Sequence, residues 1–259
     1  MRIGLAQLDA GKVDWHHADP FTPYIAAGAD AGCTCVIFPE LSDSGYDLSV
    51  SASADGQYRR ILAEMAKEYG IWILAGVRDH GSPRDYNVLY CFSPKGDIVA
   101  RYEKMHLLPV GNPRENTCFT AGRKGGMVDI SGISFGLSIC FDLRFPSLYR
   151  SYAKVGAAVM IVVSAWPDTR IDDWYLLLQA RAVENQAYMV GVNYCGTRGD
   201  LHFGGTSAVF GPTGEPVVVA EKDHAGFLKA DLDLHKVANM RRLFPVLPYD
   251  RGIPGIEHH

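Results

Sequence analysis

The sequence predicts a single α/β domain whose sheets contain both parallel and antiparallel strands. Short apolar runs alternate with helical patterns along the chain, which is typical of βαβ units. Two hairpin signals, each a Pro-x-Gly turn before an alternating segment, indicate antiparallel pairs as well. No stretch rich in Gly, Ser or Pro divides the 259 residues, so we expect one domain.

The individual elements follow from hydrophobic periodicity. Strands are expected over residues 2–8, 34–38, 72–77, 86–92, 97–103, 133–139, 157–164, 188–194 and 225–232. Helices are expected over residues 57–69, 145–154, 173–186 and 237–243. Gly70 is the stop signal of the first helix. The third helix carries four apolar residues on one face: Leu176, Leu177, Ala180 and Val183.

The two hairpin turns resemble each other. Ser93-Pro94-Lys95-Gly96-Asp97 corresponds to Gly211-Pro212-Thr213-Gly214-Glu215, and an alternating strand follows each turn. The recurrence suggests two halves built on the same unit. Two unrelated Pro-x-Gly hairpins would produce the same match.

Composition excludes several classes of protein. Hydrophobic residues make up 47% and charged residues 21%, which is ordinary for a globular chain. A net charge of −4 offers no basic surface for nucleic acid or an anionic membrane. No apolar run is long enough to span a bilayer, and the N-terminus lacks the regions of a signal peptide. We therefore expect a cytoplasmic protein with neither nucleic acid nor membrane as a partner.

The six cysteines are scattered, and none forms a CxxC pair. A disulfide framework is therefore not expected. The close pair Cys33 and Cys35 is interpreted as two buried thiols on one face of a strand, because further metal ligands are missing nearby. We expect no metal and no cofactor.

Three phrases with reactive side chains stand at the ends of predicted strands, where α/β folds place functional groups. Cys140 lies where a strand gives way to a turn and a helix, as a nucleophile does at a strained elbow. Glu40 follows a strand and a proline, and would suit proton transfer if buried. Lys104 ends an alternating strand and would stabilise a thiolate or an oxyanion beside Cys140. Taken singly, each residue has a simpler interpretation. Cys140 would be a buried core thiol, Glu40 a cap at the surface end of a strand, and Lys104 a solvated lysine at a strand edge.

Together, these segments resemble the nitrilase superfamily of carbon–nitrogen hydrolases, whose members carry a Glu–Lys–Cys triad. The resemblance runs through most of the chain and rests on these phrases: Phe38-Pro39-Glu40 with Gly45-Tyr46, Lys104-Met105-His106-Leu107, Cys140-Phe141-Asp142-Leu143-Arg144-Phe145-Pro146, Ser164-Ala165-Trp166-Pro167, residues 180–186 and Val192-Asn193. It implies a four-layer αββα sandwich over residues 1–255, with residues 256–259 as a tag or tail remnant.

The resemblance also implies a role for each residue of the triad. Cys140 would attack the carbon of a small-molecule amide and form a thioester, while Glu40 would carry protons between sulfur, leaving ammonia and water. Lys104 and the backbone N–H of Phe141 would hold the oxyanion.

A second glutamate of the family matches Glu115, since Phe119-Thr120-Ala121-Gly122 follows at the expected place. It would orient Lys104 and the substrate amide. A loop salt bridge from Glu115 to Arg114 or Arg123 is the competing interpretation.

Residues 164–214 most resemble the omega-amidase-like branch, which deaminates omega-amides of dicarboxylic 2-oxo acids such as 2-oxoglutaramate. Such a substrate carries a carboxylate, and Arg144 is the candidate to bind it. The alternative for Arg144 is a structural pair with Asp142 or a glutamate. Tyr46, Phe141 and Trp166 are candidate walls of the substrate pocket, although aromatic residues at such positions are often core residues.

Other interpretations remain open at this point, among them a hydrolase of the same superfamily that acts on other small amides or on N-carbamoyl compounds. The usual nitrilase Cys-Trp-Glu is here Cys140-Phe141-Asp142, which argues against nitrile hydrolysis. A thiol enzyme using His106 or His202 as the base is one alternative, and a non-catalytic binding protein on the same fold is another. The family also pairs into homodimers, and the helix after Cys140 or residues 242–245 would serve that interface.

Overall fold

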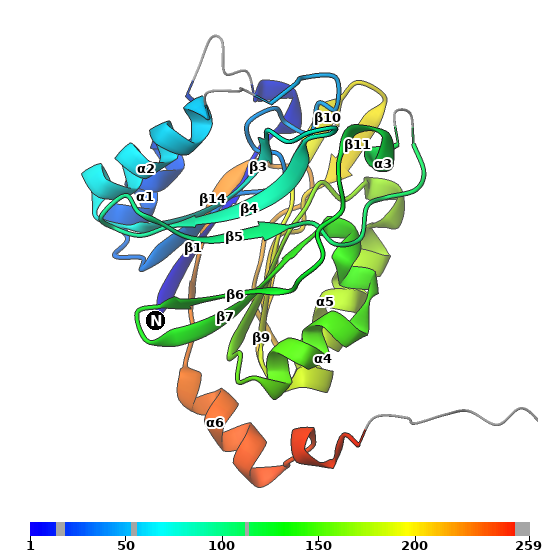
Figure 1. The fold of residues 1–259 in the computed structure, drawn as a ribbon. Coiled ribbons are helices and arrows are strands. Elements are labelled where there is room, and N and C mark those ends of the chain that lie inside the picture. Colours follow the sequence, from blue (N-terminus) through cyan, green and yellow to red (C-terminus); the bar gives the residue numbers. More distant parts are fainter. Residues whose placement is uncertain (14–18, 53–55, 112–113, 252–259) are drawn as a thin grey trace, which may run out of the picture.

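The computed structural model describes residues 1–13, 19–52, 56–111 and 114–251. Within these residues, two six-stranded sheets pack face to face and helices cover their outer sides (Figure 1). This is the predicted αββα arrangement with mixed sheets. The expected domain end at residue 255 and the tail at 256–259 lie outside the described residues.

The first sheet has the strand order β14-β1-β2-β3-β4-β5. The first three strands in the chain pair in parallel, β4 and β5 continue antiparallel, and β14 lies antiparallel to β1 at the edge. The bounds are Arg2–Gln7 for β1, Cys35–Ile37 for β2, Trp72–Asp79 for β3, Tyr86–Phe92 for β4, Ile98–Glu103 for β5 and Gly226–Asp231 for β14.

The second sheet has the order β13-β12-β9-β8-β7-β6 and repeats the same topology. Strands β7, β8 and β9 are parallel, β12 and β13 continue antiparallel, and β6 is the antiparallel edge. Gly96 and Gly214 both have φ +84°, which matches the recurring turn. The bounds are Gly126–Ile130 for β6, Ile133–Ile139 for β7, Val159–Val163 for β8, Tyr188–Val192 for β9, Ala208–Phe210 for β12 and Pro216–Val219 for β13.

Helices cover the sheets from outside. Helices α1 and α2 pack on the first sheet, while α4 and α5 pack on the second (Figure 1). Their bounds are Thr22–Asp30, Gln57–Tyr69, Pro146–Lys154 and Ile171–Asn185. The remaining elements are α3 (Glu115–Cys118), α6 (Leu234–Leu243), the hairpin of β10 (Cys195–Arg198) and β11 (Leu201–Gly204), and the 3-10 helices η1 (Ala10–Lys12), η2 (Cys140–Arg144), η3 (Asp168–Arg170) and η4 (Leu247–Tyr249).

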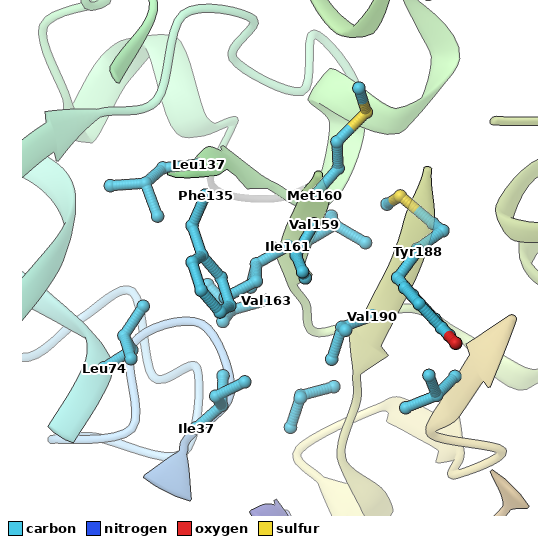
Figure 2. Close-up of a cluster of buried hydrophobic side chains, with 14 of the residues drawn as sticks. Ile37, Leu74, Phe135, Leu137, Val159, Met160, Ile161, Val163, Tyr188 and Val190 are labelled. Carbon is cyan, nitrogen blue, oxygen red and sulfur yellow. The ribbon is translucent and has the colours of Figure 1, made fainter. Parts of the chain in front are cut away.

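The main core fills the space between the two sheets and continues between the second sheet and its helices α4 and α5. Ile37 and Leu74 of the first sheet belong to the same buried cluster as Leu137, Ile161 and Val163 of the second (Figure 2). A second cluster lies between the first sheet and its helices. Because both faces of the central strands are buried, these strands are apolar throughout, which explains why they were recognisable in the sequence.

Two expectations about burial are wrong. Cys33 and Cys35 are both buried, but they belong to different clusters because Cys33 precedes the strand and alternation does not extend to it. On α5, Leu176 and Val183 are 63% and 48% exposed. The buried face of this helix is formed by Trp174, Leu178, Arg181, Ala182 and Asn185.

Several elements were not predicted. Four consecutive residues of helix α1 are alanine or glycine, so the helix has little contrast between its two faces. Strands β6, β10 and β11 are short and partly exposed. In the part of the chain that the structure describes, no helix has the length and apolar character needed to cross a membrane.

Candidate active site

Three strand ends of the two sheets bring the predicted reactive residues together. Lys104 directly follows β5, Cys140 directly follows β7, and Glu40 lies three residues after β2. Since β2 and β7 each pair in parallel within their own sheet and the two sheets pack face to face, the residues that follow these strands meet at one edge of the sandwich. The site therefore combines segments that are far apart in the chain.

The amino group of Lys104 lies between two carboxylates. Its Nζ atom is 2.6 Å from Glu40 Oε1 and 2.7 Å from Glu115 Oε1. All three side chains are buried, with at most 1% of the residue exposed. Burial alone would lower the pKa of Lys104, but the charges of Glu115 and Glu40 outweigh it and raise that pKa well above its usual value. Lys104 is thus a fixed positive charge.

The Glu40 carboxylate is held from several sides. Asn87 donates to Oε1 at 2.8 Å, and the backbone N–H of Ala165 donates to Oε2 at 2.9 Å. Burial raises the pKa of Glu40, and the charge of Lys104 opposes this rise. A carboxylate with a raised pKa that is fixed by hydrogen bonds is suited to accept and return a proton.

Cys140 occupies a strained backbone position next to these charges. Its φ is +47°, a conformation that non-glycine residues adopt rarely and mainly at functional sites. The residue is 6% exposed. Burial, followed by the negative charge of Glu40, raises the pKa of the thiol, while Lys104 lowers it. The resting thiol is therefore protonated, and ionisation requires that a neighbouring base takes its proton.

Asp142 holds the turn that presents Cys140. Its Oδ2 accepts from the backbone N–H of Ile139 at 3.0 Å and from the Tyr102 hydroxyl at 2.7 Å. Its Oδ1 accepts from the backbone N–H of His106 at 2.9 Å. As the second residue of η2, Phe141 has no carbonyl partner for its N–H within that helix, so this donor is available beside the thiol.

Glu115 forms its ion pair with Lys104 and not with an arginine. Besides Lys104, its Oε1 accepts from the Tyr46 hydroxyl at 2.9 Å, and its Oε2 accepts from the N–H of Leu108 at 2.8 Å. Among the described residues, neither Arg114 nor Arg123 forms an ion pair with it, so the competing interpretation is wrong. Tyr46 is 7% exposed, and its ring packs against Phe203 at a centroid distance of 6.0 Å.

Arg144, the last residue of η2, is partly exposed and lies over the buried ring of Trp166. The guanidinium of Arg144 stacks on the Trp166 ring at 5.0 Å and donates to Asp173 Oδ2 at 2.8 Å. The predicted structural partners were wrong, because Asp142 is occupied by Tyr102 and the backbone. The actual partner comes from α5, an element 29 residues away in the sequence.

The two candidate histidines have other partners. His106 Nδ1 is 2.7 Å from Asp142 Oδ1, and its ring stacks on Phe145 at 3.6 Å. His202 Nε2 is 2.9 Å from Asp223 Oδ1 at the surface. The charged groups that act on the Cys140 thiol are Glu40, Lys104 and Glu115, and each histidine is paired with an aspartate, so a carboxylate is favoured over a histidine as the base.

Sequence reasoning missed residues that support the site. Asn87 orients Glu40, and Ala165 supplies a backbone N–H. Ser164 follows β8 next to Cys140 and acts on its pKa. A buried asparagine within the apolar run of β4 was the one available signal, since an amide there needs a hydrogen-bonding partner.

Comparison with known proteins places this arrangement in context. The model of the family described as carbon-nitrogen hydrolase matches residues 3–242. A 2-oxoglutaramate amidase of Bacillus subtilis is 33% identical over 216 residues, which are 82% of each chain. The human omega-amidase NIT2 is 28% identical over 263 residues, covering 97% of this chain and 95% of the relative.

Solved structures agree with these sequence relatives. An amidase of Nesterenkonia sp. AN1, with acrylamide added at its active-site cysteine by Michael addition, superposes with a TM-score of 0.82. It is 29% identical, and the match covers 95% of this chain and 98% of the amidase.

Proposed function

The chain belongs to the carbon–nitrogen hydrolase family, and we propose that it acts as an omega-amidase on a small amide that carries a carboxylate. Membership of this family makes the chain an amidase-type hydrolase and argues against the non-catalytic alternative. The observation that carries the proposed site is the buried group Glu40–Lys104–Glu115 with Cys140 beside it. A nucleophile, a proton carrier and an oxyanion partner are what amide hydrolysis requires.

In the first half of the reaction, Glu40 takes the proton of the Cys140 thiol while the sulfur electron pair attacks the amide carbon. The carbonyl oxygen becomes an oxyanion, and Lys104 with the N–H of Phe141 stabilises it. Glu40 then gives its proton to the amide nitrogen and the C–N bond breaks. Ammonia departs, and the acyl group remains on Cys140 as a thioester.

In the second half, Glu40 removes a proton from water as its oxygen attacks the thioester carbon. The same donors hold the second oxyanion, the C–S bond breaks, and Glu40 returns its proton to sulfur. The free acid and the thiol result. Glu115 keeps Lys104 in place throughout, because it holds the ammonium group through a second ion pair beside the one with Glu40.

The substrate class follows from Arg144 and from the relatives. Relatives named as a 2-oxoglutaramate amidase and an omega-amidase support a dicarboxylate-derived amide. Arg144 is stacked on Trp166, and its carboxylate partner Asp173 is itself partly exposed. A substrate carboxylate would replace Asp173 on the guanidinium group of Arg144. This group is planar and binds carboxylates in a bidentate manner.

An assay of ammonia release tests the proposal. Wild type, Cys140→Ala and Arg144→Ala are compared on 2-oxoglutaramate, on neutral short-chain amides and on nitriles. We expect turnover of the carboxylate-bearing amide, little turnover of nitriles, and loss of activity in Cys140→Ala. Arg144→Ala should raise KM for the acidic substrate by about tenfold or more and leave neutral amides nearly unchanged.

Two outcomes of this assay would contradict the proposal. Equal activity of Cys140→Ala would contradict the nucleophile. An equal loss on acidic and neutral amides in Arg144→Ala would show that this arginine only pairs with Asp173.

We also propose that the protein is a cytoplasmic homodimer. All six cysteines are free, which suits a reducing compartment. Leu176 on α5 is 63% exposed, and Leu243 at the end of α6 and Phe244 just after it are 70% and 66% exposed. Apolar side chains of this size at the surface are typical of association sites.

A further inference from the structure

The parallel register of the second sheet places a serine beside the proposed nucleophile. Ile139, the last residue of β7, is paired with Val163, the last residue of β8. The next residues of the two strands are Cys140 and Ser164. Neighbouring strands are about 4.8 Å apart, so two residues at equivalent positions lie within reach of each other.

Ser164 is anchored on its other side by the backbone. Its N–H donates to the Val192 carbonyl of β9 at 2.8 Å, which continues the sheet beyond the last paired residues. The N–H of the following residue, Ala165, holds Glu40 at 2.9 Å. The segment after β8 is therefore fixed against both the neighbouring strand and the proposed base.

The Ser164 hydroxyl has no structural role of its own. The residue is fully buried, and its oxygen has no hydrogen-bond partner among the described residues. The other buried serine near the nucleophile, Ser138, is different, because its hydroxyl is bonded to Tyr149 and to the Ile161 carbonyl. A buried hydroxyl without a partner costs free energy and calls for a functional explanation.

We propose that Ser164 is a positioning residue that donates its hydroxyl hydrogen to Cys140 Sγ whenever the sulfur carries negative charge. The inference rests on the proposed function of Cys140. The hydroxyl already opposes the rise in the pKa of the thiol, although no well-formed hydrogen bond joins the two in the resting protein. Catalytic hydrogen bonds often tighten only when charge develops.

This donor acts at the two points of the reaction where a thiolate exists. It steadies the sulfur when Glu40 removes its proton, and again when the C–S bond breaks and the sulfur leaves with the electron pair. The other charged groups around the sulfur are Glu40, Lys104 and Glu115. Both glutamates disfavour the thiolate and Lys104 is shared between them, so a neutral donor adds stabilisation without another charge.

The test compares Ser164→Ala with the matched variant Ser138→Ala. Addition of acrylamide to Cys140, measured by peptide mass spectrometry between pH 6 and 9, reports the thiolate. For Ser164→Ala we expect the pKa of the thiol to rise by about one unit, so the addition rate falls about three- to tenfold at each pH. In the ammonia assay, kcat should fall by a similar factor while KM is unchanged.

Ser138→Ala removes a buried serine hydroxyl from β7, the strand that precedes Cys140, and should leave the pH dependence of the addition rate unchanged. A Ser164→Ala profile that coincides with wild type, or an equal displacement in both variants, would overturn the inference. Thermal unfolding of each variant separates these results from a loss of folded protein. If Cys140→Ala is active, the proposed function itself has failed, so the two failures are distinguishable.

Discussion

At the scale of single residues, the site depends on buried groups that neutralise one another. Lys104 is the shared partner of Glu40 and Glu115, and each of these three charges would be costly to bury alone. Their mutual compensation explains how three ionisable side chains tolerate burial beside an apolar core. Removal of Lys104 leaves two buried carboxylates without their shared counter-charge, and removal of either glutamate takes away one of the two partners of Lys104, so activity and stability are both affected by such variants.

A further buried carboxylate, Asp43, lies in the loop between Glu40 and Tyr46 and lacks such compensation. Its Oδ2 accepts from the N–H of Arg78 at 3.0 Å, and its Oδ1 has no partner among the described residues. Burial raises the pKa of Asp43 to about 7, and the hydrogen bond from Arg78 only partly opposes this. The folded protein therefore keeps a proton here that the unfolded chain loses near pH 4.

We predict that Asp43→Asn becomes increasingly stable relative to wild type as the pH rises. Between about pH 4 and 7 the unfolded wild type is ionised at this position while the folded protein still holds the proton, so its free energy of unfolding falls as the pH rises, whereas asparagine does not titrate. From pH 5 to 8 the difference in the free energy of unfolding should grow by about 2–3 kcal/mol in favour of the variant. Urea unfolding at both pH values measures it, and parallel pH dependences would contradict the prediction.

At the scale of elements, the ends of the strands determine the geometry of the site. Gly76 in β3 approaches the backbone of the Glu40 segment: a Cβ atom there would lie 2.6 Å from the Pro39 carbonyl and 2.7 Å from Glu40 Cα. Only glycine fits at this distance. The strand is thus packed directly against the residues that position the proposed base.

We predict that Gly76→Ala displaces Glu40 and reduces kcat/KM about 10- to 100-fold, because small misplacements of catalytic groups are costly. The overpacking should also lower the free energy of unfolding by about 1–3 kcal/mol. Gly226→Ala in β14 is the control, since a Cβ atom there meets nothing within 4 Å. Steady-state kinetics and urea unfolding of both variants provide the test. Equal kinetics in the two variants would mean that the Glu40 segment adapts to the extra methyl group.

At the scale of the whole molecule, two repeats of one topology face each other and contribute different parts of the site. The first sheet provides the segments with Glu40 and Lys104, and the second provides the segments with Cys140 and Ser164. The shared core between the sheets therefore fixes the distance between the proposed base and the nucleophile. Neither half contains the complete site.

The exposed apolar residues on α5 and after α6 lead to a prediction about assembly. Wild type should show the mass of two chains in light scattering coupled to size-exclusion chromatography. Leu176→Asp and Phe244→Asp should shift it toward one chain, because a buried charge weakens an apolar interface. Ile98→Asp on the edge strand β5, where the side chain is 47% exposed, is the control. A single-chain mass for wild type would contradict the homodimer.

Local sequence patterns were sufficient to predict many of the helices and strands and the motifs of the site. The bounds of α2, β4 and β7 were predicted to the residue, because periodicity and terminating glycines are properties of neighbouring residues. The phrases around Glu40, Lys104 and Cys140 were recognisable for the same reason, and together they indicated the family. The elements that were missed, such as α1 and β6, lack contrast between a buried and an exposed face.

Contacts between distant segments were decided only by the folded chain. Asp173 as the partner of Arg144, Asn87 as the support of Glu40, and Ser164 beside Cys140 join segments separated by 24 to 47 residues. Sequence patterns report which face of an element is apolar, but they do not report which residue of another element lies opposite. That choice depends on strand register and sheet packing, which exist only once the two sheets have come together.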